Sequence, residues 1–307
     1  MSDLNAKIRE EAKKLFKGDN PVAFVIGHKV SPVLPGRAVP FYARSEEACD
    51  ELIFDHTCQI NLSGLLKLHH RQSKRFGIVA KGCDVRGVVS LLQEKQLLRD
   101  QVVIIGVPCD GVVDFNSVED LTEVPKKNEE NVEERCRACD VKVPHFCDVS
   151  LSNEEEEEKK NEAAAPPLPP AAKLLMDKEL DERWQEWEES ISQCIRCHAC
   201  RKNCPVCACN SCIFEETTPT WVDRSTNPSD NVLYSMVRLW HLSGRCVGCG
   251  ECERACPAGI PFTKITAHLA NDSKQLFGSR PGDDPDAKRI LVTFDEEEDA
   301  KLADFIL

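Results

Sequence analysis

The stretch CIRCHACRKNCPVCACNSC, residues 194–212, holds seven of the 18 cysteines of the chain within nineteen residues. Its first four thiols follow the spacing C-x2-C-x2-C-x3-C and precede a proline, and the same spacing recurs in CVGCGECERACP, residues 246–257. Cysteines at three-residue steps allow a tight loop to wrap one corner of a [4Fe-4S] cube. Tetrahedral zinc sites usually pair two C-x2-C knuckles and do not use a third step. The two complete copies therefore predict two iron-sulfur clusters.

The fourth cysteine of such a run, which is the bacterial ferredoxin run, ligates the other cluster. One predicted cluster therefore takes Cys194, Cys197, Cys200 and Cys256, and the other takes Cys204, Cys246, Cys249 and Cys252. Because each cluster draws ligands from both runs, the region should not fold without iron. Basic side chains near the ligands either favour the more negative reduced clusters or serve solubility; they are Arg196, Arg201, Lys202, Arg245 and Arg254.

Three thiols remain in the opening stretch, namely Cys207, Cys209 and Cys212. They could ligate three corners of a fourth cluster, with Cys147 or a residue of another chain as the remaining ligand. They could equally be structural thiols, or replace one of the ligands assigned above. We favour the structural or replacement interpretation over a further cluster. Cys49 and Cys58 lack ligand spacing and are expected to be small buried hydrophobic residues.

The composition places the chain among intracellular metal proteins. Its N-terminus has no apolar segment typical of a signal peptide, and no window approaches the length needed to span a bilayer. We therefore expect a cytoplasmic location, where dense cysteines more often bind metal than form disulfides. The formal net charge of -13 argues against a nucleic-acid partner, because phosphate binding depends on clustered Lys and Arg.

The domain organisation follows from an acidic run that passes into an Ala/Pro tract, which is typical of a linker over 151–173. Residues 1–150 alternate apolar runs with helical patterns, as in RFGIVA, DVRGVVSLLQEKQLL and QVVIIGV, which form a strand, helix, strand unit. We expect an α/β domain with a small parallel sheet there. Residues 174–280 should form a mainly α-helical ferredoxin-type domain with two clusters, followed by a tail over 281–307.

Two helices are expected in the second domain. The first, at about 174–193, places Leu180, Trp184, Trp187 and Ile191 at three- and four-residue steps. We expect both tryptophans to pack in the core rather than to stack on a cofactor. The second, in NVLYSMVRLWHLSG, has Leu233, Val237 and Trp240 on one face. The linker suggests a tethered module that either swings between donor and acceptor or docks on a neighbour.

A separate set of cysteines lies in the first domain. Cys83 and Cys109 each follow a predicted strand, so their thiols should lie at the carboxyl edge of the parallel sheet, where such folds bind ligands. With Cys136 and Cys139 of CRACDVKVPHFCD they would hold one further [4Fe-4S] cluster, and Cys147 is the rival for the fourth place. A zinc ribbon at Cys136 and Cys139 is the alternative.

Two resemblances support these assignments. LWHLSGRCVGCGECERACPAGIP resembles the α-helical ferredoxin domains of succinate dehydrogenase and heterodisulfide reductase iron-sulfur subunits. AKGCDVRG, GVPCDG and CRACDVKVPHFCD, within residues 76–150, resemble the beta subunits of coenzyme F420-reducing hydrogenase and related formate dehydrogenases. The second resemblance implies a [4Fe-4S] cluster and an FAD between which electrons pass. The chain departs from that family in placing its ferredoxin module after the linker and in its short α/β region.

No hydrolytic triad, phosphate-binding loop or dinucleotide-binding fingerprint is present in the sequence. We therefore expect a non-catalytic electron-transfer subunit of a cytoplasmic, anaerobic redox complex. It would relay electrons through at least three [4Fe-4S] clusters between a hydrogenase, formate dehydrogenase or heterodisulfide reductase-like partner and an acceptor subunit. The alternative is a flavin-dependent oxidoreductase subunit that exchanges a hydride with a soluble carrier. A zinc-stabilised scaffold is the third hypothesis.

Overall fold

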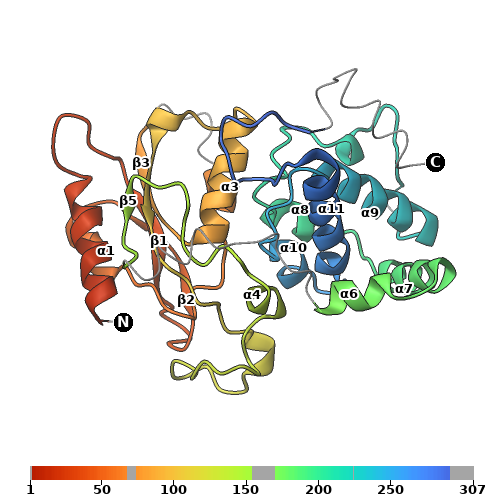
Figure 1. Cartoon of the computed structure of the whole chain (residues 1–307), viewed down its shortest axis with the longest axis horizontal. Helices are drawn as coiled ribbons and strands as arrows, with labels where there is room; N and C mark the ends of the chain where they lie inside the picture. Colours follow the sequence, from red (N-terminus) through yellow and green to blue (C-terminus); the bar gives the residue numbers. More distant parts are fainter. Residues whose placement is uncertain (1, 68–73, 154–169, 224, 291–307) are drawn as a thin grey trace.

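A five-stranded sheet organises the first part of the chain in the computed structural model, which describes residues 2–67, 74–153, 170–223 and 225–290. The strands are β1 (Val25–Val30), β2 (Ala38–Ala43), β3 (Phe76–Ala80), β4 (Val102–Gly106) and β5 (Val149–Ser150). They lie in the order β2-β1-β3-β4-β5, and all neighbours are parallel except the antiparallel pair β1 and β2 (Figure 1). The expected small, mostly parallel sheet is therefore confirmed.

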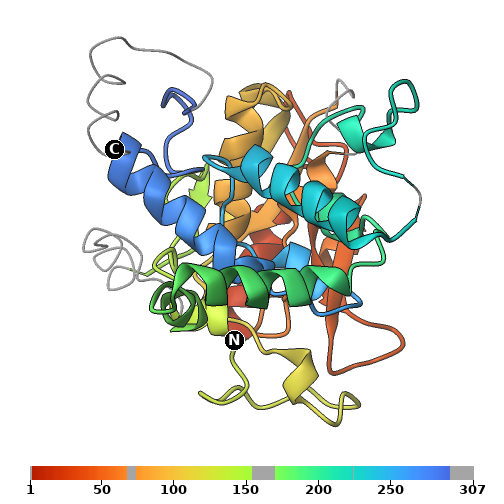
Figure 2. The same cartoon turned by 90° about the vertical axis from the view of Figure 1, so that its right-hand side faces the viewer.

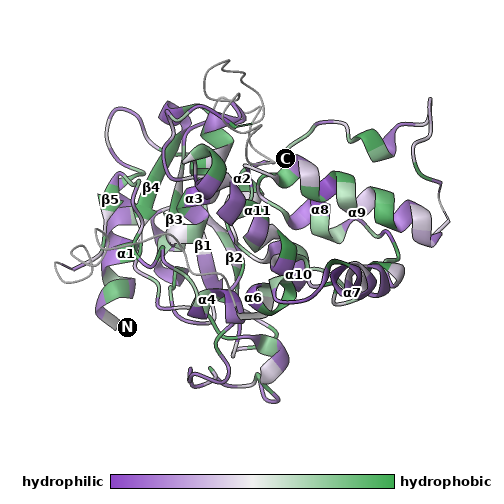
Figure 3. Ribbon diagram, turned by 45° about the vertical axis from the view of Figure 1, so that its right-hand side comes forward, coloured by the Kyte–Doolittle hydropathy of each residue, from purple (hydrophilic) through white to green (hydrophobic). Residues whose placement is uncertain are grey.

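Helices cover both faces of this sheet because successive strand residues point to opposite sides. On β3, Val79 packs in one core with Ile8 of α1 (Ser2–Lys14), whereas its neighbour Ile78 packs in a second core with Val85 and Val88 of α3 (Gly82–Gln93). β1 and β4 alternate in the same way. In Figure 3 the ribbon of β4 is coloured as predominantly hydrophobic, as a strand covered on both faces requires. The result is an α/β/α arrangement.

The sequence predicted the central strands but missed both outer ones. β2 contains Pro40, which cannot donate a ladder hydrogen bond and is tolerated because β2 is an edge strand. β5 has only two residues, too few to give a pattern. The helical patterns of SEEACDELI and LSGLLKLHH also predict two helices, over 45–53 and 62–70. The first is only the 3-10 turn Glu47–Glu51, and the second is the single turn α2 (Ser63–Leu66). Residues 68–70 of the second prediction lie outside the described part.

The second part of the chain is helical, as expected for a ferredoxin-type region. Its helices are α6 (Pro170–Met176), α7 (Leu180–Ser192), α8 (Ala199–Asn203), α9 (Pro228–Leu242), α10 (Glu251–Arg254) and α11 (Phe262–Phe277). The turned view of Figure 2 shows α7, α9 and α11 on the side of the molecule that faces away from the sheet. Residues 154–169 of the expected linker and 291–307 of the expected tail lie outside the described residues.

The buried faces of α7 and α9 differ from the sequence prediction. On α7, Trp187 packs edge-on against Phe262, as expected, but Trp184 is 46% exposed. On α9, Leu233 and Trp240 are exposed, and the buried face combines Tyr234, Leu239 and Leu242 with polar residues. The prediction followed apolar periodicity, which is misleading here because the inner face of α9 supplies hydrogen bonds to the cysteine loops.

The helical region is docked on the α/β region through buried polar contacts. Arg86 of α3 donates to the carbonyl oxygens of Val247 and Pro281, and Glu251 of α10 accepts from the backbone N–H of Asn61. Arg280 pairs with Asp140 across the same boundary. These contacts join the two regions of one chain, and the predicted role of the linker, swinging or docking on a neighbour, stays a prediction.

Candidate metal centres

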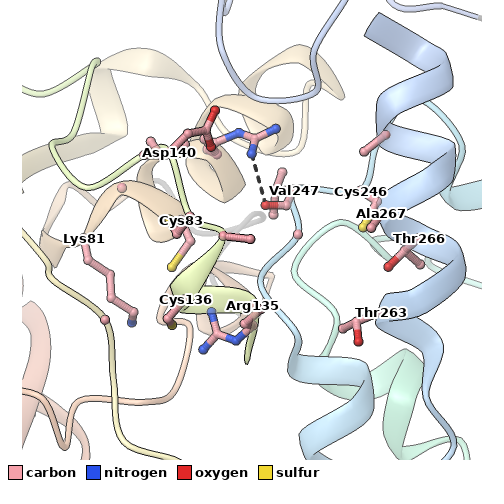
Figure 4. A pocket seen from close by; sticks show the side chains of 18 of the residues that line it. Lys81, Cys83, Arg135, Cys136, Asp140, Cys246, Val247, Thr263, Thr266 and Ala267 are labelled. Atoms are coloured by element: carbon pink, nitrogen blue, oxygen red, sulfur yellow. Dashed lines mark hydrogen bonds between the residues drawn. The ribbon is translucent and has the colours of Figure 1, made fainter. Parts of the chain in front are cut away.

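A cavity of about 120 Å³ lies between the carboxyl edge of the sheet and the helical region. The side chains around it come from the segments after β3 and β4, from α4 (Glu134–Arg137) and from the loop before α10 (Figure 4). The thiols of the α/β region that line it are those of Cys83, Cys109, Cys136 and Cys139. The structure thus brings together both sheet-edge cysteines and the C-x2-C pair, and Cys246 of the helical region lines the same cavity.

Backbone packing places Cys83 at this position. β3 ends at Ala80, and α3 begins at Gly82, where an added Cβ would lie 1.9 Å from the carbonyl oxygen of Val141. Only glycine permits this approach, which brings the segment after Cys139 against the start of α3. Local packing therefore fixes the distance between the strand-end cysteine and the C-x2-C pair.

Two cations, the buried Lys81 and the largely buried Arg135, also line the cavity, and sequence analysis missed both. The Lys81 ammonium is 2% exposed and donates to the Asp84 carboxylate at 3.1 Å and to the Ile60 carbonyl oxygen at 2.8 Å. Burial lowers its pKa, but Asp84 and the neighbouring thiols outweigh that effect, so the pKa is raised and Lys81 stays charged. The sequence signal that could have identified Lys81 is its position between a predicted buried strand and Cys83.

Cys83 and Cys109 have raised pKa values in this cavity. Burial raises the pKa of Cys83 to about 12 and that of Cys109 to about 11. Binding of iron must therefore displace their protons, as metal sites generally require. The four thiols of the α/β region are a donor set that fits a [4Fe-4S] cluster, and the two neighbouring cations offset its negative charge.

Cys147 does not line this cavity. Its side chain packs against the core beneath α3, and an added Cβ at Gly106 of β4 would lie 3.0 Å from its sulfur. The structure therefore does not support Cys147 as the rival ligand. The reason is that β5 follows directly and holds the segment against β4.

The first ferredoxin quartet meets at a small cavity of about 20 Å³, whose lining includes Cys194, Cys197, Cys200 and Cys256. These are the four thiols that the exchange of the fourth cysteine predicts to share one cluster. Asn231 and Arg238 of α9 donate to the carbonyl oxygens of Cys194 and Cys200 at 2.8 and 3.0 Å. The polar face of α9 thus holds the first loop in place.

The second quartet lies next to the first. Cys204 and Cys249 are buried in one small core, with Cys246 packed against it, and Cys252 is buried beside Cys200 in the adjoining core. Cys83 of the α/β region also packs against the core of Cys204 and Cys249. The three sets of thiols are therefore consecutive neighbours.

The two cysteine loops have the same backbone conformation. The residue before the second cysteine of each loop is left-handed, with φ of 46° at Arg196 and 68° at Gly248. The residue after it is also left-handed, with φ of 60° at His198 and 72° at Gly250. The same pair of left-handed residues therefore flanks the second cysteine of each loop.

Most of the cations that the sequence placed beside the clusters are paired with carboxylates. Arg201 pairs with Glu215, Arg245 with Glu94, and Arg254 with Glu133 and Glu251. Arg238, which the sequence analysis did not single out, is 4% exposed and lies near Cys200, Cys204 and Cys252. No local sequence motif predicts that Arg238 is buried, because its burial depends on how α9 packs.

Among the residues that the structure describes, no three His, Cys, Asp or Glu side chains converge closely enough to hold a single metal ion. A cube of iron and sulfur is wider than an ion and takes its thiolates at separate corners. Across the same described residues, no helix combines the length and apolarity needed to cross a bilayer.

Comparison with known proteins agrees with this geometry. A model of the family described as 4Fe-4S binding domain matches residues 242–262. The chain is 23% identical over 345 residues to the F420-dependent formate dehydrogenase subunit beta of Methanocaldococcus jannaschii, with 89% of each protein covered. It is 24% identical over 331 residues to the F420-dependent formate dehydrogenase 1 subunit beta of Methanococcus maripaludis, with 83% of this chain and 85% of that protein covered.

These similarities reach well beyond residues 76–150, to which the sequence motifs confined the resemblance, because they include the ferredoxin-type region. The chain thus contains a 4Fe-4S binding domain and is similar over most of its length to proteins named as beta subunits of F420-dependent formate dehydrogenases.

Proposed function

We propose that this protein is an electron-transfer subunit that relays electrons through at least three [4Fe-4S] clusters. The observation that carries the proposal is the packing of Cys83 against the buried core of Cys204 and Cys249. It makes the N-terminal thiol set a direct neighbour of the second ferredoxin quartet, and Cys252 and Cys200 share the next core. Consecutive clusters at such contacts form a path for single electrons.

The ligands in this proposal are the thiol sets described above. Cys83, Cys109, Cys136 and Cys139 hold the N-terminal cluster. Cys204, Cys246, Cys249 and Cys252 hold the middle cluster, and Cys194, Cys197, Cys200 and Cys256 hold the outer one. Lys81 and Arg238 supply buried positive charge, and Arg135 supplies largely buried positive charge, that favours the reduced clusters.

The partners are the other subunits of a redox complex. The relatives are named as subunits of formate dehydrogenases, which supports a dehydrogenase at one end of the path and an acceptor subunit at the other. A hydrogenase or a heterodisulfide reductase-like partner would fit the same path. We assign the complex to the cytoplasm of an anaerobic cell, because cluster ligation needs reduced cysteine thiolates and the cytoplasm keeps thiols from forming disulfides.

A second function is favoured by the name that the relatives carry, F420-dependent. In that case the subunit binds FAD and exchanges a hydride with a soluble carrier, and the clusters collect the electrons one at a time. Stoichiometric flavin released by denaturing the anaerobically purified chain supports this second function. Absence of flavin supports the simple relay.

The relay is tested in the complex that co-purifies with the full chain. Cys83→Ser should remove the N-terminal cluster and stop electron transfer to the terminal acceptor. Activity of the partner dehydrogenase with an artificial dye should remain. Cys49→Ser is the matched control, because Cys49 is buried in the α/β core and donates to the Ser45 carbonyl oxygen, which serine can also do. Unchanged overall turnover in a Cys83→Ser complex that has lost the cluster would refute the relay.

A further inference from the structure

A second and larger cavity, of about 560 Å³, lies beside the ferredoxin quartets and has no role in the relay described above. It is bounded by the segment after α8, by the 3-10 turn Ile213–Glu215 and by α9. Cys207, Cys209 and Cys212 all line it. The three surplus thiols of the opening sequence therefore share one space.

The positions of these thiols do not suit a purely structural role. Cys207 packs against the core that contains Cys204 and Cys249, but Cys209 is exposed and Cys212 is half-buried. No disulfide joins any of them among the described residues. Thiols that served only to fill a core would be buried, as Cys49 and Cys58 are.

Replacement of an assigned ligand also fits poorly. Cys207 is close to the second quartet, since its backbone N–H donates to the carbonyl oxygen of Cys204 at 3.3 Å. Cys209 and Cys212, in contrast, are absent from the cores that hold Cys204, Cys249 and Cys252. At least two thiols of the cavity thus remain without a cluster to join.

The cavity is strongly basic, which favours a negatively charged occupant. Its lining includes Lys67, Arg201, Lys202, Arg238 and Arg245, and its carboxylate, Glu215, is paired with Arg201. Arg201 also makes a hydrogen bond with the Cys212 thiol. A cluster bound by thiolates carries net negative charge, so nearby cations stabilise it.

The backbone before the thiols is anchored from the other domain. Lys67 donates from its ammonium to the carbonyl oxygens of Cys204 at 2.6 Å and Lys202 at 3.1 Å. This contact fixes the segment from which Cys207 projects. The wall of the cavity is therefore ordered by contacts that need no occupant.

We propose that Cys207, Cys209 and Cys212 bind a fourth [4Fe-4S] cluster, each through one iron. The fourth iron takes a ligand other than cysteine, and the imidazole of His241, which lines the same cavity, is available for that place. The cluster would be more exposed to solvent than its neighbours because Cys209 is exposed. This assignment concerns cofactor content alone and does not depend on the relay.

Iron and acid-labile sulfide are counted in the full chain after anaerobic purification and reconstitution. Four clusters give about sixteen iron atoms per chain and three give about twelve. The variant Cys207→Ser, Cys209→Ser, Cys212→Ser should lose about four iron atoms and keep about twelve. The control Cys49→Ser should lose none.

Low-temperature electron paramagnetic resonance of the reduced protein assigns the loss. One signal should disappear in the triple variant, and His241→Ala should shift that same signal if the imidazole is the fourth ligand. A wild-type count of about twelve iron atoms would overturn the fourth cluster, whatever the variant does. One bound zinc per chain that vanishes in the triple variant would overturn it as well. Neither outcome touches the relay, which fails only through lost electron transfer in the Cys83→Ser complex.

Discussion

The carboxylate of Glu133 accepts a hydrogen bond from the guanidinium of Arg254, with 2.9 Å between Oε2 and Nη1, across 121 residues of sequence. Glu133 belongs to the α/β region beside the N-terminal thiols, and Arg254 lies between two ferredoxin cysteines. Burial raises the pKa of Glu133, but Arg135 and Arg254 outweigh burial and lower it. This ion pair therefore joins the two segments that carry the N-terminal and ferredoxin-type predicted cluster sites.

Arg254→Gln should lower the free energy of unfolding by about 3 kcal/mol, because it leaves Glu133 and Glu251 buried with fewer partners. Urea unfolding followed by circular dichroism measures this loss. Adding Glu133→Gln should recover part of it. Lys7→Gln, at an exposed pair on α1, should leave stability nearly unchanged. An Arg254 variant as stable as the wild type would contradict this stabilising role.

The N-terminal ligand set is tested by two serine substitutions. Cys139→Ser should lower iron content by about four atoms per chain, because Cys139 lines the cavity with the three other thiols of the proposed N-terminal ligand set. Cys147→Ser should leave iron content unchanged, because that side chain packs against Gly106. Elemental analysis decides between them, and the reverse result would restore Cys147 as the ligand.

Lys81→Met should make the midpoint potential of the N-terminal cluster more negative, because a buried positive charge beside its thiols is lost. A unit charge at this range is worth on the order of 100 mV. Adding Asp84→Asn removes the charge left behind and should return part of the shift. A redox titration measures the potentials. Lys7→Met is the control, and an equal potential in both variants would count against the role of Lys81.

Removing iron should unfold the ferredoxin-type region and spare the sheet. The two large apolar cores of the α/β region contain no predicted ligand in their buried parts, whereas both small helical cores are built partly from cysteines. Hydrogen exchange of apoprotein and holoprotein should show lost protection in α8, α9 and α10, with β3 and β4 still protected. Equal protection throughout would show that the helices fold without clusters.

Acid should destabilise the sheet through His28. Its side chain is 2% exposed, and burial together with Lys81 holds its pKa well below the ordinary value. The unfolded chain therefore binds the proton first, so stability is lost as the pH falls below about 6.5. His28→Gln should flatten the pH dependence of the unfolding free energy by up to about 1.4 kcal/mol per pH unit. Urea titrations between pH 7 and pH 5 that run parallel for both proteins would contradict this.

The parts of the fold that were predictable are those with local patterns. β3, α3 and β4 have continuous apolar runs or helical spacing. The two C-x2-C-x2-C-x3-C runs predict their ligands from spacing alone. The buried face of α9 was not predictable, because Asn231, Tyr234 and Arg238 are polar or amphipathic residues that bond to loops distant in sequence. Periodicity of apolar residues selects the wrong face of such a helix.

The N-terminal site shows the same division. The strand ends predict the shared position of Cys83 and Cys109, because the carboxyl ends of parallel strands lie at one edge of the sheet. Cys139 and Cys147 could not be separated from sequence, since the choice depends on how β5 pairs with β4. Lys81 and Arg135 went unnoticed because a buried cation has no local signature.

The matched left-handed residues of the two cysteine loops make the halves of the ferredoxin-type region energetically unequal. The second loop adopts these conformations with Gly248 and Gly250, while the first does so with Arg196 and His198. A residue with a Cβ costs roughly 1–2 kcal/mol in that conformation. The first loop therefore carries more backbone strain than the second, and we expect oxidative loss of the predicted clusters to open the chain there first.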